Sequence, residues 1–107
     1  MNQWEIWGCD LGWGSHPVVI ISHPARVARK DFVEVLDCAS QRVQRSPLDH
    51  EVVLDEADGL DWPTFCKCDC IFAVPREELK RRRGEVTKER CRQIVRAIIQ
   101  SHGWNAL

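Results

Sequence analysis

The chain has 107 residues, of which 44% are hydrophobic and 29% are charged, and its formal net charge is −1 at pH 7. This length suits one domain over residues 1–107 with a modest core, and a net charge near zero does not mark the chain as a nucleic-acid-binding protein. No apolar run approaches the roughly 20 residues of a membrane span, and the N-terminus lacks a signal-like segment, so we expect a cytoplasmic location and no membrane.

The first part of the chain has the pattern of a β-hairpin. Residues 5–10 and 18–22 are apolar, β-branched or aromatic runs, and Gly12-Trp13-Gly14-Ser15 separates them. Glycines between two strand-like runs favour a short turn. We therefore expect two strands joined by a turn at the start of the fold.

Three further segments predict strands, because apolar and polar residues alternate in them or β-branched residues dominate. They are residues 32–38, 51–54 and 65–73. Pro75 suits a first helical position, and we expect a short helix from there to near Gly84. The sequence thus predicts a β core of about five strands.

A terminal helix is predicted after this core. Thr87 is a suitable N-cap, and Glu89 lies in the first turn, where the helix dipole favours a carboxylate. Apolar residues then recur on one face before Gly103, at Cys91, Ile94, Val95, Ile98 and Ile99. This amphipathic pattern predicts a helix that packs on the β core.

Cysteines occupy alternate positions in residues 65–71, where Cys66, Cys68 and Cys70 flank Lys67 and Asp69. On a strand the three thiols point to one face, while the lysine and the aspartate point to the other, about 7 Å apart. An acid and a base therefore share one surface. The alternative is an ordinary exposed charge pair on a strand.

Six cysteines in so short a chain have three interpretations: disulfides, a metal site or reduced core residues. Without a secretion signal, disulfides are disfavoured. Cys-x-Cys-x-Cys differs from the usual Cys-x-x-Cys zinc motif and needs a fourth ligand from elsewhere. We favour buried thiols and expect no metal or other cofactor, with a metal-binding module as the alternative.

Several short motifs follow one another in an order that resembles a known family, the MazF/PemK (Kid-like) toxins of bacterial toxin–antitoxin systems. The motifs are Trp4-Glu5-Ile6-Trp7, Asp10-Leu11, residues 17–22, Lys67-Cys68-Asp69 and residues 81–86. The resemblance covers about residues 3–103. It implies an SH3-like barrel with a C-terminal helix as a single MazF/PemK-like domain, usually a homodimer. It also implies a toxin that cleaves single-stranded RNA without a metal and is neutralised by a cognate antitoxin protein.

The resemblance implies transesterification by the ribose 2′-hydroxyl, which leaves a 2′,3′-cyclic phosphate. Asp69 matches the base of the Kid-like branch, and Lys67 matches an arginine that acts there as acid and charge stabiliser. Lysine keeps the charge but loses the bidentate fork. His16 stands where the family usually has an arginine before the proline, and an imidazole transfers protons near neutral pH. We expect His16, Lys67 and Asp69 to be catalytic, with His16 as general acid, or as base with Asp69 orienting it. The alternative for His16 is a turn residue without a role.

Five further residues are candidates for RNA binding. Glu5 matches a glutamate of the family's opening motif and contacts RNA or orders the first strand. Ser40 stands near the position of a catalytic Thr-Ser pair, of which the threonine is missing here. Arg42 and Arg45 are placed to hold phosphates, and Trp13 is placed to stack on a base or to bury against a partner subunit.

Two departures from the family pattern favour a second interpretation. The loop before Pro17 is shorter than usual, and Ala39-Ser40 lacks the threonine. The alternative is therefore a non-catalytic member of the same fold that binds a protein or nucleic acid, as in gyrase-poisoning CcdB toxins. The cationic run at residues 80–83 is interpreted as the solvated end of the expected short helix.

Overall fold

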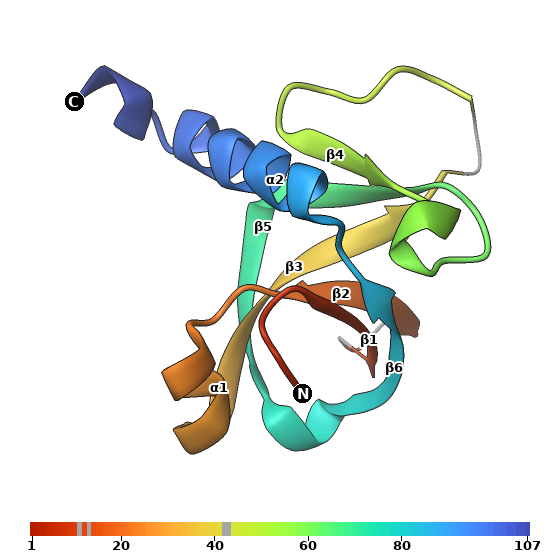
Figure 1. Cartoon of the computed structure of the whole chain (residues 1–107), viewed down its shortest axis with the longest axis vertical. Coiled ribbons are helices and arrows are strands. Elements are labelled where there is room, and N and C mark those ends of the chain that lie inside the picture. The colour runs from red at the N-terminus through yellow and green to blue at the C-terminus, as the bar shows by residue number, and fades with distance from the viewer. Residues whose placement is uncertain (11, 13, 42–43) are drawn as a thin grey trace.

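The computed structural model describes residues 1–10, 12, 14–41 and 44–107. Six strands form one antiparallel sheet in the order β4-β5-β3-β2-β1-β6 (Figure 1). The elements are β1 (Glu5–Asp10), β2 (Ser15–Ile20), α1 (Pro24–Arg29), β3 (Phe32–Ser40), β4 (Glu51–Leu54), β5 (Thr64–Pro75), β6 (Leu79–Glu85) and α2 (Lys88–Ser101). The predicted mainly β fold with a C-terminal helix is confirmed.

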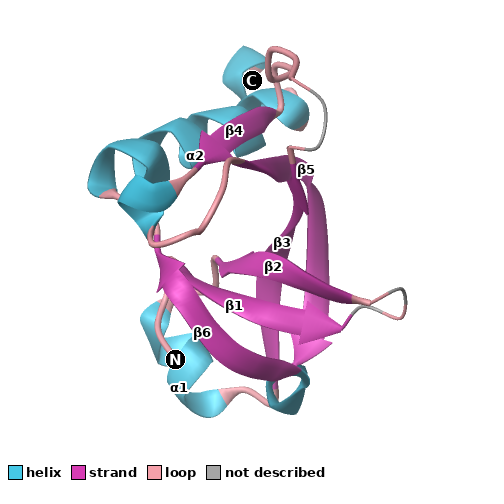
Figure 2. Cartoon of the chain, turned by 90° about the vertical axis from the view of Figure 1, so that its right-hand side faces the viewer, coloured by secondary structure: helices cyan, strands magenta, loops and turns pink. Residues whose placement is uncertain are grey.

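The sheet curls strongly without closing, as the second view shows (Figure 2). Its edge strands are β4 and β6, which do not pair with each other in the described part of the chain. Helix α2 lies across β4 and β5, and α1 contacts β3. The arrangement is therefore an open, barrel-like sheet with one long helix over one end.

The segment after Pro75 differs from the predicted helix. Only Arg76–Glu78 forms a 3-10 turn, and Leu79–Glu85 is strand β6, antiparallel to β1. Leu79 and Gly84 are buried against the sheet, while Lys80 and Arg81 are exposed. The cationic run therefore lies on an edge strand, where charged side chains discourage pairing with other chains, and not at the end of a helix. Helix α1 was also not among the predicted elements.

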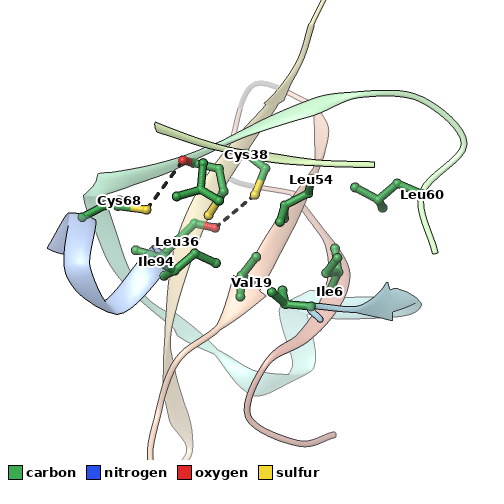
Figure 3. Packing of buried hydrophobic residues seen from close by; sticks show 12 residues of the cluster. Ile6, Val19, Leu36, Cys38, Leu54, Leu60, Cys68 and Ile94 are labelled. Atoms are coloured by element: carbon green, nitrogen blue, oxygen red, sulfur yellow. Dashed lines mark hydrogen bonds between the residues drawn. The ribbon is translucent and has the colours of Figure 1, made fainter. Parts of the chain in front are cut away.

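Two apolar clusters lie on opposite faces of the central strands. Neighbouring residues such as Val18 and Val19 fall into different clusters. Strands buried on both faces carry continuous apolar runs, which explains why residues 18–20 and 35–36 show no alternation. The first cluster, between the sheet and α2, includes Leu36 and Ile94 (Figure 3).

Cysteines contribute to this first cluster as reduced thiols. Cys38, Cys66 and Cys68 are fully buried, and no described cysteine is in a disulfide. Figure 3 shows the Cys38 thiol donating to the Leu36 carbonyl and the Cys68 thiol donating to the Cys66 carbonyl. Hydrogen bonds to Cys38 and Cys68, together with burial, hold the pKa of the Cys66 thiol well above its ordinary value. These three cysteines are therefore packing residues, as the sequence predicts.

An ion-pair network attaches the start of α2 to the sheet. Thr87 caps the helix as predicted, its hydroxyl accepting from the backbone N–H of Arg90. The Arg90 guanidinium pairs with Asp55 at 2.6 Å and with the buried Asp58. Asp58 also accepts from the Thr87 backbone N–H at 2.9 Å. The backbone of Asp58 lies so close to β6 that only a glycine fits opposite it, at Gly84.

Replacing Gly84 with alanine is predicted to destabilise the fold. The new Cβ would stand 2.0 Å from the Asp58 carbonyl oxygen, so the turn and β6 must separate. We expect a loss of about 2 to 3 kcal/mol in the free energy of unfolding, measured by urea denaturation. Gly8→Ala on β1 is the matched control, because its Cβ meets nothing nearer than the Ser15 hydroxyl at 3.6 Å. Equal effects of the two substitutions would contradict this close approach.

Candidate active site at the bend of strand β5

Strand β5 bends where its pairing with β3 changes register. Leu36 stands opposite Ile71 and Cys38 stands opposite Cys66, with an irregularity between the two pairs. Residues 67–70 thus face only Asp37 on β3, so this part of β5 cannot continue the regular ladder. β5 visibly changes direction there (Figure 1). The predicted single face of three cysteines is therefore interrupted: Cys70 is half-buried and lies outside the core clusters.

Lys67 pairs with a carboxylate of the neighbouring strand. Its Nζ lies 3.7 Å from Oδ2 of Asp37, and the two side chains are 35% and 9% exposed. Asp37 lies on β3 opposite Val18 of β2. The other Asp37 oxygen, Oδ1, is buried and has no hydrogen-bond partner among the described residues. Lys67 is thus a surface cation with its ionic partner below it.

Asp69 lies beside a different side chain, the imidazole of His50. Its Oδ2 lies 3.6 Å from Nε2 of His50, and both side chains reach the surface. The His50 carbonyl accepts from the backbone N–H of Cys68 at 2.8 Å, which holds His50 beside the bend. A surface pocket of about 500 Å³ opens here, lined by Asp49, His50, Asp69, Gln100, Ser101 and Asn105. The acid of the predicted pair therefore faces a pocket at the end of α2.

The thiol of Cys70 lies among these charges. Burial raises its pKa first, and the charges of Asp69 and Asp37 raise it further, while Lys67 lowers it. Cys70 directly follows Asp69 on β5, and the ion pair between Lys67 and Asp37 lies at the same bend. The raised pKa keeps this cysteine protonated, so its surroundings do not activate it as a nucleophile.

His16 lies on strand β2, which pairs with β3 on the side opposite β5. It is half-buried and stands opposite Cys9 of β1. His16 lies two positions before Val18, so the two side chains share a face of β2. Because Val18 is directly opposite Asp37, His16 and Asp37 are diagonal neighbours in the sheet. The predicted catalytic residues thus come from β2 and β5, on either side of β3.

Ser40 lies at the end of β3 and contacts a tryptophan. Its hydroxyl accepts from Nε1 of Trp62 at 2.9 Å, and Trp62 is 52% exposed. An exposed indole at this place is suited to stacking on a base. Trp13 and Arg42, two of the predicted RNA-binding residues, lie outside the described residues.

The side chain of Arg45 makes contacts within the protein, to Glu51 and Phe65. Its guanidinium donates two hydrogen bonds to Glu51, at 2.7 and 2.9 Å, and lies 4.1 Å over the ring of Phe65. The bond from Arg45 is the main reason why the pKa of Glu51 falls to about 2. Arg45 therefore fastens the loop before β4 to β5 through its own contacts.

Glu5 is a buried carboxylate of β1 that is hydrogen-bonded to Arg82 of β6. It accepts from the Asn2 backbone N–H at 2.7 Å, from Trp7 Nε1 at 3.1 Å and from Arg82 Nε at 2.8 Å. Burial alone would raise its pKa, but the hydrogen bonds from Arg82, Trp7 and Asn2 outweigh it and lower the pKa to about 2. Of the two roles predicted for Glu5, these contacts match the ordering of the first strand.

Three residues near the predicted site were missed by the sequence reasoning. Asp37 carried a signal, since it is a charged residue among inward-facing valines of β3. Trp62 carried a weaker one, as an aromatic residue in a polar Asp-Trp-Pro loop. His50 carried none, because only the β4–β5 register brings it to Asp69.

No group of three or more His, Cys, Asp or Glu side chains suited to a metal ion occurs in the described ranges. The helices there are also too short or too polar to cross a membrane.

A curled antiparallel sheet with one helix across it is the fold of the MazF toxins. Residues 2–102 match the family model of PemK-like, MazF-like toxins of type II toxin–antitoxin systems. The chain therefore belongs to this family. No curated protein matches the chain significantly.

Solved structures of toxins have the same fold. An endoribonuclease in complex with its cognate antitoxin from a mycobacterial species is 25% identical, with a TM-score of 0.84 over 96% of this chain and 95% of that one. The Mycobacterium tuberculosis toxin MazF-mt6 is 23% identical, with a TM-score of 0.81 over 92% of this chain and 96% of that one. A MazE–MazF structure from Deinococcus radiodurans is 14% identical, with a TM-score of 0.76 over 96% and 95%.

Glu5→Gln is predicted to weaken the fold in a pH-dependent way. The carboxyl titrates near 4.5 when unfolded and near 2 when folded, so its ionised form stabilises the protein above about pH 4.5. This contribution disappears as the pH falls toward 2. We expect a loss of about 1 kcal/mol at pH 7, reduced by solvent around the half-exposed Arg82, and a gap that closes in acid. Urea unfolding at pH 7 and pH 3 measures it.

Glu85→Gln is the matched control, because Glu85 stands opposite Glu5 and also faces Arg82, at 3.7 Å, but is 63% exposed. We expect almost no change of stability in this variant. If Glu5→Gln lost as much stability at pH 3 as at pH 7, the ionised Glu5 would not be the stabilising form.

Proposed function

We propose that this protein is a toxin endoribonuclease that cleaves single-stranded RNA, without a metal, by attack of the ribose 2′-hydroxyl. The observation that carries this proposal is that the ion pair of Lys67 with Asp37 and the close approach of Asp69 to His50 both lie at the bend of β5, in a chain of the MazF-like family. A solved relative in that fold is named an endoribonuclease. Asp69, the proposed base, and Lys67, the proposed cation, lie on β5, and His16, the proposed acid, lies on β2 across β3 from them.

In the proposed reaction, Asp69 accepts the 2′-hydroxyl proton, and His50 lies beside it at 3.6 Å. The 2′-oxygen forms a bond to phosphorus as the bond to the 5′-oxygen breaks, which leaves a cyclic phosphate. Lys67 neutralises the charge that develops on the phosphorane oxygens. His16 gives a proton to the departing 5′-oxygen, as an imidazole does near neutral pH. RNA supplies the nucleophile, so no cysteine or serine side chain has to attack.

Ser40, Trp62, Trp13 and Arg42 provide the proposed contacts to the rest of the RNA. Trp62 stacks on a base beside Ser40, and Trp13 and Arg42 keep their predicted roles in base stacking and phosphate binding. Glu5 and Arg45 act indirectly by holding the strands that frame the site.

The proposed protein partners are an antitoxin and a second copy of the chain. An apolar groove of about 720 Å³ runs between α2 and the end of β6, and Val95 in it is 44% exposed. Trp4 also lines the groove, with a φ of 72° that is strained for a bulky residue and points to a function. Cys91, Val95 and Ile99 recur every fourth residue, so they lie on one face of α2, which is the proposed contact with a second copy. The groove is also lined by Glu85, Arg92 and Arg96, which offer charges of both signs to a second copy.

Incubation of purified protein with a long single-stranded RNA in EDTA tests the activity. We expect discrete cuts that end in cyclic phosphate, and a loss of at least about 100-fold in rate for Asp69→Asn and for His16→Ala. Asp31→Asn, an exposed aspartate at the start of β3, is the matched control and should cleave normally. Intact RNA from a folded wild-type protein would favour the alternative, a toxin fold that acts by binding a protein or nucleic acid.

Val95→Asp is predicted to separate the proposed dimer. The substitution buries a carboxylate at the centre of the apolar stripe, which is costly. Sedimentation equilibrium should give a dimer for the wild type and a monomer for the variant. Gln93→Asp, which adds the same charge to another face of α2, should remain dimeric. A wild type that is monomeric at micromolar concentration, or a dimeric Val95→Asp, would refute the assignment of this groove.

A further inference from the structure

Asp37 has a buried carboxylate oxygen without a partner. Its Oδ1 is the one buried side-chain oxygen or nitrogen in the described part of the chain that makes no hydrogen bond. The residue is 7% exposed and sits in β3 between the fully buried Leu36 and Cys38. An unsatisfied buried oxygen lowers the stability of a fold, and a buried charge does so more. The fold therefore carries a cost at Asp37 that its packing does not explain.

Two neighbours of Asp37 on its face of the sheet are apolar. Val18 stands opposite it on β2, and Val35 precedes it on the same face of β3. A valine would complete this face without a desolvation cost. What the carboxylate adds is its ion pair with Lys67, at 3.7 Å from Oδ2 to Nζ.

We propose that Asp37 is a positioning residue that fixes the Lys67 ammonium at the bend of β5 and directs it toward the scissile phosphate. This inference rests on the proposed function. An ammonium group carries three N–H donors. With Asp37 at ion-pair distance on the buried side, the ammonium is left with donors for the outer side, where the proposed RNA substrate binds. Asp69 is 43% exposed and Asp37 only 7%, so the role of base is assigned to Asp69.

Lysine needs such an anchor more than arginine does. A guanidinium presents a planar fork that is already organised for two phosphate oxygens, whereas a lysine ends a flexible chain with a point charge. Fixing the charge in advance removes an ordering step from the reaction. The ion pair with Asp37 thus gives the Lys67 charge a fixed position that the flexible lysine side chain does not have by itself.

Separate partners also keep the two acids at the bend distinct. Asp37 pairs with Lys67, and Asp69 lies beside His50. Because the buried Asp37 carboxylate already compensates the charge of Lys67, Asp69 is not needed as its partner. Asp69, 43% exposed, stays open to the substrate as a proton acceptor.

The first test uses Asp37→Asn, which keeps the shape of the side chain and removes its charge. We expect kcat for RNA cleavage to fall about 100-fold, with KM changed by less than about threefold, because binding of the RNA remains and alignment of Lys67 is lost. The double variant Asp37→Asn/Lys67→Gln should be no slower than Lys67→Gln alone. If the double variant were slower than Lys67→Gln by the full factor that Asp37→Asn alone causes, the two residues would act independently and the proposal would be wrong.

A rescue experiment separates positioning from general damage. Asp37→Asn/Lys67→Arg should recover much of the activity lost in Asp37→Asn, because the guanidinium fork needs no anchor. Asp31→Asn serves as the matched control and should leave kcat unchanged. A double variant as slow as Asp37→Asn would count against the proposal.

Thermal unfolding gives a readout independent of RNA cleavage. We expect Asp37→Val to unfold at the same or a higher temperature than the wild type, since it removes a buried unsatisfied carboxylate. Lys67→Met should unfold at a lower temperature, because it leaves that carboxylate buried without its cation. A marked fall of Tm in Asp37→Val would show that Asp37 serves the fold and would refute the proposal.

Nitrogen NMR of the Lys67 ammonium distinguishes failure of this inference from failure of the proposed function. We expect a slowly exchanging, ordered ammonium signal in the wild type and its loss in Asp37→Asn. If the wild type shows this signal but does not cleave RNA, the proposed function fails while the positioning of Lys67 stands. A disordered Lys67 in the wild type overturns the positioning itself.

Discussion

The change of register between β3 and β5 is the constraint on which the candidate site depends. On one side of it Leu36 pairs with Ile71, and on the other Cys38 pairs with Cys66. The residues of β5 in between must form a corner, because β3 offers them only Asp37. On one side of the corner, residues 64–66 of β5 pair with both β3 and β4, and on the other side residues 71–75 pair with β3 (Figure 1). The curl of the sheet and the place of the polar cluster therefore have one cause.

Burial decides how the charges at this corner are arranged. Asp37 is inside the sheet, so its partner Lys67 has to reach inward, whereas Asp69 is at the surface beside His50. Elsewhere buried carboxylates are fully hydrogen-bonded, as Glu5 is by Arg82, Trp7 and Asn2. Asp58 is satisfied in the same way by Arg90 and Thr87. Asp37 differs from these residues, because one of its buried oxygens has no hydrogen-bond partner among the described residues. Glu5 and Asp58, which hold parts of the fold together, have their hydrogen bonds complete.

Local signals in the sequence were enough for much of the fold and for little of the site. The Thr87 cap and the spacing of Ile94 and Ile98 predicted α2, since a helix is defined by neighbours along the chain. Strand β6 was predicted as helix because its evidence is non-local: pairing with β1, with Glu85 opposite Glu5, overrides the local pattern after Pro75. His50 was missed for a similar reason, because its position beside Asp69 follows from the β4–β5 register. Asp37 was visible as a charge in an apolar strand, but its pairing with Lys67 was not.

The departures of this chain from its family's motifs make physical sense when they are considered together. A lysine in place of an arginine at position 67 loses a preorganised fork, and an imidazole at position 16 in place of an arginine loses a permanent charge. Both changes reduce fixed positive charge where the proposed phosphate binds. In the proposed reaction, the buried carboxylate of Asp37 gives the Lys67 cation a fixed position, and His16, on β2, is the proton donor. The proposed site therefore divides charge and proton transfer between Lys67 and His16, where the family pattern that the chain resembles has arginines.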